Sequence, residues 1–231
     1  MTDKLILFDI DGTLLLSRGI PRVSFLTVLK KHFPNISDKT YVKFSGMTDP
    51  QIIKQILHAN GDNTKLSDQL LKKLFMEFSI ELAKNLTREN PPDLLPGIVK
   101  LLDKLQSIPN CYLGLVTGNI MAGARIKLLT AGLYHYFPLG AFGSDHENRN
   151  LLPPIAVERA QNYYNKLFKK SDTWIIGDSI YDIRCAQANN FKNIAVLTGF
   201  TPESAFKDEN PDFILKNLED TTKVLSIIGF N

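Results

Sequence analysis

The sequence holds 231 residues, with 27 Lys and Arg against 24 Asp and Glu, so its net charge is only +3. Its 44% hydrophobic and 22% charged residues are typical of a folded globular protein and exclude an intrinsically disordered one. The sequence has no apolar run of about 18 residues and no cluster of basic residues, so we expect neither a membrane-spanning helix nor a nucleic-acid partner.

The cysteines and the N-terminal residues indicate where the protein works. Cys111 and Cys185 are far apart and lack the spacing of metal ligands, so we expect buried free thiols, which suit a reducing cytoplasm. The apolar stretch at 5–8 is too short for the core of a signal peptide, and acidic residues follow it at once. We therefore expect this stretch to belong to the fold and the protein to be cytoplasmic.

The first predicted element is a buried strand over 5–8, which runs into the motif Phe-Asp-Ile-Asp-Gly-Thr at 8–13. Asp9 and Asp11 follow the carboxyl end of this strand, where open α/β sheets bind their ligands. Two carboxylates at such a place repel each other unless a cation binds between them or a proton neutralises one of them. An Asx turn in an ordinary polar loop is the alternative, and it explains a single Asp better than this pair.

The next part of the chain shows helical spacing of apolar residues instead of strand patterns. A crossover between parallel strands needs only a few dozen residues, but the next clear strand begins about 100 residues later. We predict a helical cap domain over 16–90, inserted into an α/β core formed by 1–15 and 91–231. The segment Ser45–Asp49 is either a loop of the cap that reads the substrate or a loop that ends in a helix N-cap before Pro50.

The remaining sequence alternates between short apolar runs and helical patterns. Strands are predicted over 112–116, 173–177 and 193–197, and helices over 98–105, 122–131 and 155–166. In the first of these helices, Val99, Leu102 and Leu105 lie at helical spacing. This alternation predicts an α/β fold, a Rossmann-like parallel sheet with right-handed crossovers.

Two more polar motifs follow predicted strands. Thr117, Gly118 and Asn119 come after the strand at 112–116 and precede a helix, which is a favourable place to bind an anion, although Thr or Asn as a helix N-cap explains the pattern equally well. Asp178 follows the strand at 173–177, and Asp182 lies four residues beyond it, on the same face of a helix.

Asp178 and Asp182 also have a purely structural explanation. Asp178 or Ser179 can be a helix N-cap, and Asp182 a first-turn acid favoured by the helix dipole. If these acids meet Asp9 and Asp11, each close pair of charges costs roughly 3 kcal/mol at an effective dielectric constant near 20. All-oxygen ligands of this kind favour Mg²⁺ beside a phosphate.

The chain resembles the haloacid dehalogenase superfamily of phosphotransferases. The resemblance rests on FDIDGT at 8–13, VTGN at 116–119 and GDSIYD at 177–182, on their order, and on the helical insert after the first motif. The segments at 96–105, 197–199 and 211–220 look like the phosphoglycolate-phosphatase-like branch. The resemblance implies a Mg²⁺-dependent phosphatase acting on a small phosphorylated metabolite.

The resemblance also implies roles for the motif residues. Asp9 would be the nucleophile that forms an aspartyl-phosphate, and Asp11 the general acid and base. Asp9, the Asp11 carbonyl and Asp178 would hold Mg²⁺, with Asp182 supporting the metal site. Thr117 and the amide of Gly118 or Asn119 would hold the phosphoryl oxygens.

One residue departs from the family pattern, which expects a Lys ahead of the last motif. The comparable segment at 150–155 has none, so the cation beside Asp9 and the phosphate would be Arg149 or Arg159. We favour Arg149, which precedes that segment directly. A guanidinium would bind phosphate through a planar fork instead of a point charge.

Three other activities fit the same motifs. A phosphomutase needs both Asp9 and Asp11 and differs by excluding water from the intermediate. A dehalogenase would not need Asp11, which argues against that activity. A catalytically weakened phosphate-binding relative is the third, because the usual Lys is missing. The sequence predicts neither the substrate nor the oligomeric state.

Overall fold

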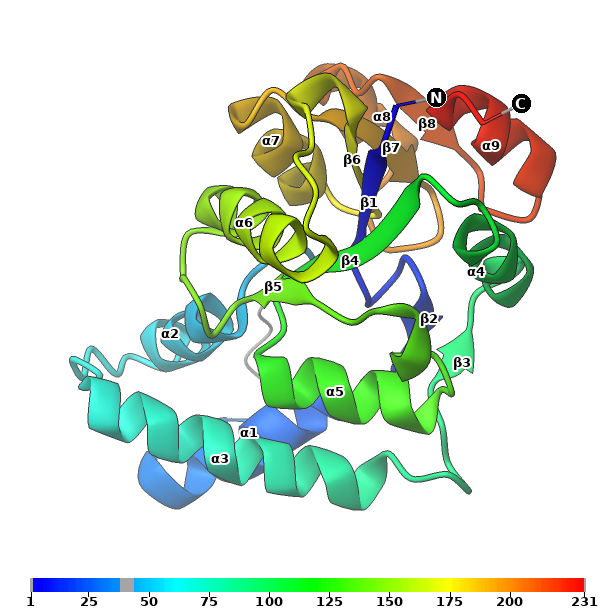
Figure 1. Ribbon diagram of the computed structural model, residues 1–231. Coiled ribbons are helices and arrows are strands. Elements are labelled where there is room, and N and C mark those ends of the chain that lie inside the picture. Colours follow the sequence, from blue (N-terminus) through cyan, green and yellow to red (C-terminus); the bar gives the residue numbers. More distant parts are fainter. Residues whose placement is uncertain (1, 38–43, 231) are drawn as a thin grey trace.

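The computed structural model describes residues 2–37 and 44–230 (Figure 1). Its central sheet contains β1 (Lys4–Phe8), β4 (Cys111–Thr117), β5 (Gly140–Phe142), β6 (Thr173–Gly177), β7 (Lys192–Val196) and β8 (Phe213–Leu215). The strands are ordered β5-β4-β1-β6-β7-β8, and every neighbouring pair is parallel. The predicted α/β fold with a Rossmann-like parallel sheet is confirmed.

The strand order brings the ends of β1, β4 and β6 together. Counted along the chain, the sheet strands run three-two-one-four-five-six, and the order reverses between β1 and β6. A parallel sheet opens a crevice at the carboxyl ends of its strands at such a reversal. Phe8, the last residue of β1, lies beside Leu115 of β4 and Ile176 of β6. The polar motifs that follow these strands therefore begin at one edge of the sheet.

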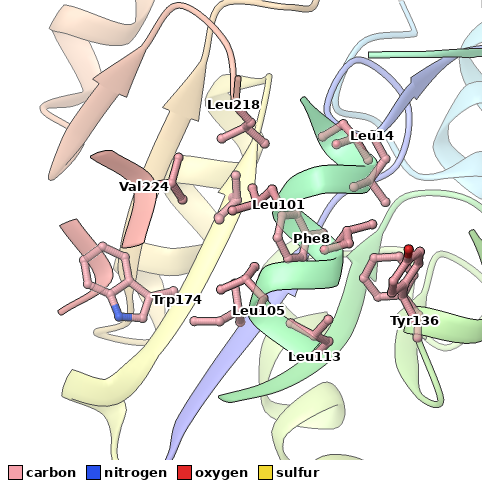
Figure 2. Close-up of a cluster of buried hydrophobic side chains, with 14 of the residues drawn as sticks. Phe8, Leu14, Leu101, Leu105, Leu113, Tyr136, Trp174, Leu218 and Val224 are labelled. Atoms are coloured by element: carbon pink, nitrogen blue, oxygen red, sulfur yellow. The ribbon is translucent and has the colours of Figure 1, made fainter. Parts of the chain in front are cut away.

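Helices cover both faces of the sheet. They are α4 (Ile98–Gln106), α6 (Leu152–Tyr164), α7 (Ile180–Ala188), α8 (Glu203–Glu209) and α9 (Thr221–Ile228). On one face, Phe8 belongs to the same apolar cluster as Leu101 and Leu105 of α4 and Val224 of α9 (Figure 2). On the other face, alternate residues such as Leu7 pack among side chains of α6 and α7. This alternation along β1 is what a strand buried on both faces requires.

One helical position was predicted wrongly. The spacing in the helix over 98–105 placed Val99 with Leu102 and Leu105, but Val99 is 42% exposed, and the face turned to the sheet also contains Ile98 and Leu101. Val99 lies next to Leu102 around the helix, so the spacing of apolar residues fits a buried face that includes Val99 as well as the face that the structure buries. Cys111 and Cys185 are free and buried, as predicted.

A second apolar cluster lies in the helical part of the chain between β1 and α4. It is formed by α1 (Ile20–His32), α2 (Asp49–Ala59) and α3 (Asp68–Asn85), with Phe25, Ile53 and Phe78 at its centre. Helix α5 (Met121–Thr130) follows β4, yet it lies along α3, and Ile120 joins this cluster (Figure 1). A short antiparallel pair, β2 (Leu15–Leu16) and β3 (Asp93–Leu94), stands where the chain enters and leaves the helices.

The helices of this second cluster begin where local residues favour it. Helix α1 starts at Ile20, and Pro21 is well placed in its first turn. Helix α2 also has a proline, Pro50, in its first turn. None of the helices in the described ranges is both long and apolar enough to cross a bilayer.

Candidate active site

The loop after β1 folds back on itself and presents Asp9 and Asp11 at the sheet edge. The carbonyl of Ile10 accepts hydrogen bonds from the amides of Thr13 and Leu14, at 3.3 and 2.8 Å. Gly12 has a φ of +82°, and a Cβ there would strike the carboxylate of Asp178. The turn therefore needs glycine, both for its backbone conformation and for the close approach of the second acidic motif.

Asp9 is almost completely buried and faces a guanidinium. Arg149 Nη2 lies 3.1 Å from Asp9 Oδ1, and both side chains are under 10% exposed. Burial raises the pKa of Asp9 to about 6, even though the charge of Arg149 acts to lower it. Its neighbours Asp182 and Asp11 raise the pKa further, and a hydrogen bond with Thr117 lowers it. Burial therefore favours the neutral form of Asp9, and Arg149 favours the charged form.

The structure brings Arg149, and not Arg159, to Asp9. Arg149 lies in a short 3-10 turn before α6 and also binds Asp182 Oδ1 and, at 3.2 Å, the carbonyl of Gly46. Arg159 binds both carboxylate oxygens of Asp145, at 2.6 and 2.8 Å, away from the site. Burial would lower the pKa of Arg149, but the charges of Asp182 and Asp9 outweigh it and raise the pKa.

Asp178 and Asp182 lie beside Asp9. One carboxylate oxygen from each of the three residues lies within 4.8 Å of the others, and all three residues are buried. Asp182 Oδ2 also accepts hydrogen bonds from the backbone amide and hydroxyl of Ser179, at 3.0 and 2.6 Å, in a capping box at the start of α7. The structural explanation of Asp182 is therefore confirmed, because it is a first-turn acid in the capping box that Ser179 begins.

Asp178 has fewer protein partners. It accepts a long hydrogen bond from Thr13 Oγ1, at 3.4 Å. Burial raises the pKa of Asp178 well above its ordinary value, and Asp9 and Asp182 raise it further. A Cβ on Gly12 or on Gly199 would collide with this carboxylate, so backbone surrounds it closely.

This donor set fits a divalent cation. Buried carboxylates that repel one another are stabilised when a cation lies between them, and hard oxygen ligands suit Mg²⁺. Asp9 and Asp178 have the oxygens best placed for this purpose. Asp182 is engaged by Arg149 and by the start of α7, so it holds its neighbours in place.

Asp11 lies next to a buried lysine that our sequence analysis missed. Lys127 Nζ donates to Asp11 Oδ2 at 2.5 Å and to Asn119 Oδ1 at 2.6 Å, and Lys127 is only 2% exposed. Ser17 Oγ donates to Asp11 Oδ1 at 2.8 Å. Burial alone would raise the pKa of Asp11, but Lys127 and the hydrogen bonds from Asn119 and Ser17 outweigh it and lower the pKa.

A signal for Lys127 was present in the sequence. Helix α5 buries Ala124 and Leu128, and position 127 falls on the same face of that helix. A lysine at a core-facing helical position requires a buried acid as its partner. The sequence did not show which acid this was.

The motif after β4 contacts both Asp11 and the helical part of the chain. Asn119 Nδ2 donates to Asp11 Oδ2 at 2.9 Å and to Thr117 Oγ1 at 2.8 Å. A Cβ on Gly118 would collide with the carbonyl of Met47, and the Gly118 carbonyl accepts the amide of Asp49 at 2.8 Å. Gly118 therefore allows the loop before α2 to come close to the sheet edge.

The segment Ser45–Asp49 ends in a helix N-cap, as one of its two predicted interpretations expects. Thr48 is the N-cap of α2, with Gln51 Oε1 accepting its amide at 3.1 Å. The segment also lines the cavity above Asp9 and Asp11. Asp49 Oδ2 accepts the amide of Ile120 at 2.7 Å, and burial raises the pKa of Asp49 to about 7 against the lowering effect of Lys127.

The site opens into a cavity of about 740 Å³ between the sheet edge and the helices. Polar side chains form its floor and mostly apolar side chains form its roof. The floor includes Asp9, Asp11, Thr117, Asn119, Lys127, Arg149 and Asp178. This arrangement can hold a charged group on the floor and a larger, less polar group beneath the roof.

Comparisons with known proteins agree with the motifs. The family model for haloacid dehalogenase-like hydrolases matches residues 6–196. A pyrophosphatase, PpaX, from Oceanobacillus iheyensis is 26% identical over 230 residues, which cover 99% of this chain and 98% of that protein. A phosphoglycolate phosphatase from Nitrosococcus oceani is 25% identical over 226 residues, which cover 96% of each chain.

Solved structures share the fold. A β-phosphoglucomutase from Clostridium difficile superimposes with a TM-score of 0.74, covers 99% of this chain and 97% of its own, and is 18% identical. A hydrolase from Pseudomonas syringae superimposes with a TM-score of 0.73, covers 96% of this chain and 98% of its own, and is 18% identical. At these identities the likeness concerns the fold alone.

Proposed function

The chain belongs to the haloacid dehalogenase-like hydrolase family, and from this premise we propose that it is a Mg²⁺-dependent phosphatase. Its substrate is a small phosphorylated metabolite, a phosphate monoester, and the reaction passes through an aspartyl-phosphate. One observation carries the proposal: the buried carboxylate of Asp9 lies 3.1 Å from the guanidinium of Arg149 and beside Asp178, at the reversal of the strand order. Relatives named phosphatases support the reaction class.

In the first half of the proposed reaction, a carboxylate oxygen of Asp9 attacks phosphorus. The bond from that oxygen to phosphorus forms, and the bond from phosphorus to the substrate oxygen breaks. Protonated Asp11 gives its proton to the leaving oxygen. Arg149 offsets negative charge on Asp9 and on the phosphoryl group, while Thr117 and the amide of Gly118 or Asn119 hold phosphoryl oxygens.

In the second half, Asp11 accepts a proton from water. The oxygen of that water attacks phosphorus, the aspartyl-phosphate bond breaks, and Asp9 and inorganic phosphate are released. Lys127 favours the ionised form of Asp11, which is the form that accepts the proton. Asn119 and Ser17 fix its two oxygens in place.

Asp9, Asp178 and the backbone carbonyl of Asp11 would hold Mg²⁺. When bound, the ion neutralises charge on the acids and on the phosphoryl oxygens. Asp182 supports this site through Arg149 and through the start of α7.

We further propose that residues 16–90 act as a cap over a core of 1–15 and 91–231. The helices of the segment share an apolar cluster of their own, and Met47 and Asp49 lie over the site. The position of Arg149 argues against the weakened relative, because a cation does lie beside Asp9.

Hydrolysis of para-nitrophenyl phosphate tests this function. We expect turnover with Mg²⁺, loss of turnover with chelator, and no turnover by Asp9→Asn in either condition. Asp208→Asn, an exposed residue on α8, is the matched control and should behave like the wild type. Wild-type rates in Asp9→Asn would remove Asp9 as the nucleophile, and turnover in chelator would remove the need for the metal.

A further inference from the structure

The roof of the active-site cavity is apolar and partly aromatic. Leu16, Phe25, Phe44, Met47 and Ile52 line it, with Arg18, Arg22 and Asp49 of the same part of the chain at the cavity wall, while the acids of the sequence motifs, Lys127 and Arg149 lie on the opposite floor. A cavity of about 740 Å³ is in the range of about 300–1,000 Å³ that holds drug-sized ligands. Pyrophosphate or phosphoglycolate would fill the floor and leave most of the roof without a partner.

The aromatic part of the roof is held rigidly. Phe25 stacks on Phe78 of α3, with ring centres 3.7 Å apart and planes at 8°, and meets Phe44 edge to face at 6.3 Å. The guanidinium of Arg22 lies 5.1 Å from the centre of the Phe44 ring. These contacts fix the two rings before a ligand arrives, so contact with them costs little ordering entropy.

The basic residues of the cavity wall have partners of their own. Arg18 donates to Asn90 Oδ1 and to the Pro91 carbonyl, at 2.8 and 2.6 Å. Arg22 lies over Phe44. A second anionic group beneath the roof would have to compete for these cations, and it would lose its water against apolar side chains.

We infer that the substrate is a phosphate monoester with an apolar or aromatic leaving group, which lies beneath the Phe25–Phe44 roof while the phosphate lies on the floor. This inference rests on the proposed function and deepens it by naming the chemical class of the leaving group. Phe44 and Phe25 are then specificity-determining residues. Phe200, 82% exposed and also at the cavity, lies where a longer leaving group would emerge.

A series of alkyl phosphates tests the leaving group without changing its intrinsic reactivity much. We compare ethyl, n-hexyl and 2-phenylethyl phosphate with phosphoglycolate and pyrophosphate, all with Mg²⁺. We expect kcat/KM to rise by about fourfold for each methylene that becomes buried, and to be highest for 2-phenylethyl phosphate. A preference for phosphoglycolate or pyrophosphate over ethyl phosphate, or equal rates along the alkyl series, would overturn the inference.

A substitution in the roof tests whether the roof causes the preference for an aromatic leaving group. Phe44→Ala should reduce kcat/KM for 2-phenylethyl phosphate at least about tenfold more than for ethyl phosphate. Tyr163→Ala removes an exposed ring on α6, outside the cavity, and should leave this ratio unchanged. An unchanged ratio in Phe44→Ala would overturn the assignment of the roof.

Binding of phosphonates, which cannot be hydrolysed, separates this inference from the phosphatase proposal. We expect 3-phenylpropylphosphonate to bind at least about tenfold more tightly than propylphosphonate by calorimetry. If no ester is turned over but this difference persists, the phosphatase proposal fails and the ligand class stands. Equal affinities would overturn the ligand class, even in a chain that hydrolyses every ester.

Discussion

Two positive side chains face the two acids of the first motif, one each. Arg149 contacts Asp9, and Lys127 contacts Asp11. They differ in chemistry because a guanidinium can bind two carboxylates with one rigid fork, whereas an ammonium is a compact point charge. Arg149 contacts both Asp9 and Asp182 through Nη2, and its second terminal nitrogen, Nη1, donates to the Gly46 carbonyl.

Replacing Arg149 by Lys should therefore reduce activity although the charge remains. We expect kcat for para-nitrophenyl phosphate to fall by about tenfold or more in Arg149→Lys, because a lysine has no second nitrogen to keep the contact with the Gly46 carbonyl while its first one holds both acids. Arg159→Lys, which alters only the pair with Asp145, should keep the wild-type kcat. The opposite ranking would show that Arg159 supplies the cation.

Lys127 should matter most for the step in which Asp11 accepts a proton, because it lowers the pKa of Asp11. In Lys127→Met the pKa of Asp11 rises, so we expect the acid limb of the kcat profile to move to higher pH and kcat for para-nitrophenyl phosphate at neutral pH to fall by about tenfold or more. Lys100→Met on α4, an exposed residue, is the matched control. An unchanged pH profile would mean that Lys127 has a structural role only.

The site residues differed in how well the sequence predicted their positions. Asp9, Asp11 and Asp178 follow buried strands, so the parallel sheet alone brings them together. Lys127 comes from the second turn of α5, and its contact with Asp11 depends on the crossing of that helix over the sheet edge. The core-facing position of Lys127 signals a buried acid as its partner, but the sequence does not show how α5 packs, so it cannot identify that acid as Asp11.

Among the secondary-structure elements, the length of a strand determined whether the sequence could predict it. Strands β1, β4, β6 and β7 have five to seven residues and clear apolar runs. Strands β5 and β8 have three residues each, too few to show a periodicity. The pair β2 and β3 has two residues on each strand. It forms where the chain enters the helical part and where it leaves it again.

The contact between the helical part and the sheet edge depends on Gly118. In Gly118→Ala, the new Cβ would collide with the Met47 carbonyl, so the loop before α2 must move, at a cost of about 1–3 kcal/mol. We expect a lower free energy of unfolding and a lower kcat. In Gly123→Ala, inside α5, the Cβ meets only ordinary contacts of 3.4 Å or more, and this variant should gain about 0.5–1 kcal/mol. Urea unfolding and kcat of both variants test this contrast.

Over the whole molecule, buried acids make stability depend on pH. The pKa of Asp49 is raised to about 7 and that of Asp9 to about 6, so the folded state binds protons that the unfolded state has released. Stability from these groups is present at low pH and is lost as pH rises from about 4 towards 7. In chelator, Asp49→Asn should remove up to about 4 kcal/mol of this loss. Urea unfolding between pH 4 and 8 measures it, and an unchanged pH dependence would contradict it.

Binding of Mg²⁺ should offset the loss of stability at high pH. At a concentration of about 100 times its Kd, the ion should raise the free energy of unfolding by about 2.7 kcal/mol at pH 8. Asp178→Asn should show little of this gain, while Asp208→Asn should show all of it. Thermal melts with Mg²⁺ and with chelator test both variants, and a full gain in Asp178→Asn would place the ion elsewhere.

The pairing of β2 with β3 has a consequence for how such a protein can diversify. Leu15 lies opposite Leu94, and Leu16 opposite Asp93, so the chain leaves the sheet and returns to it at neighbouring points. The segment between them can therefore be lengthened, shortened or replaced without altering the register of β1 with β4 and β6. If the proposed function holds, we expect new leaving-group preferences to arise by exchange of this one contiguous segment, while the acids proposed to carry the chemistry stay where the sheet puts them.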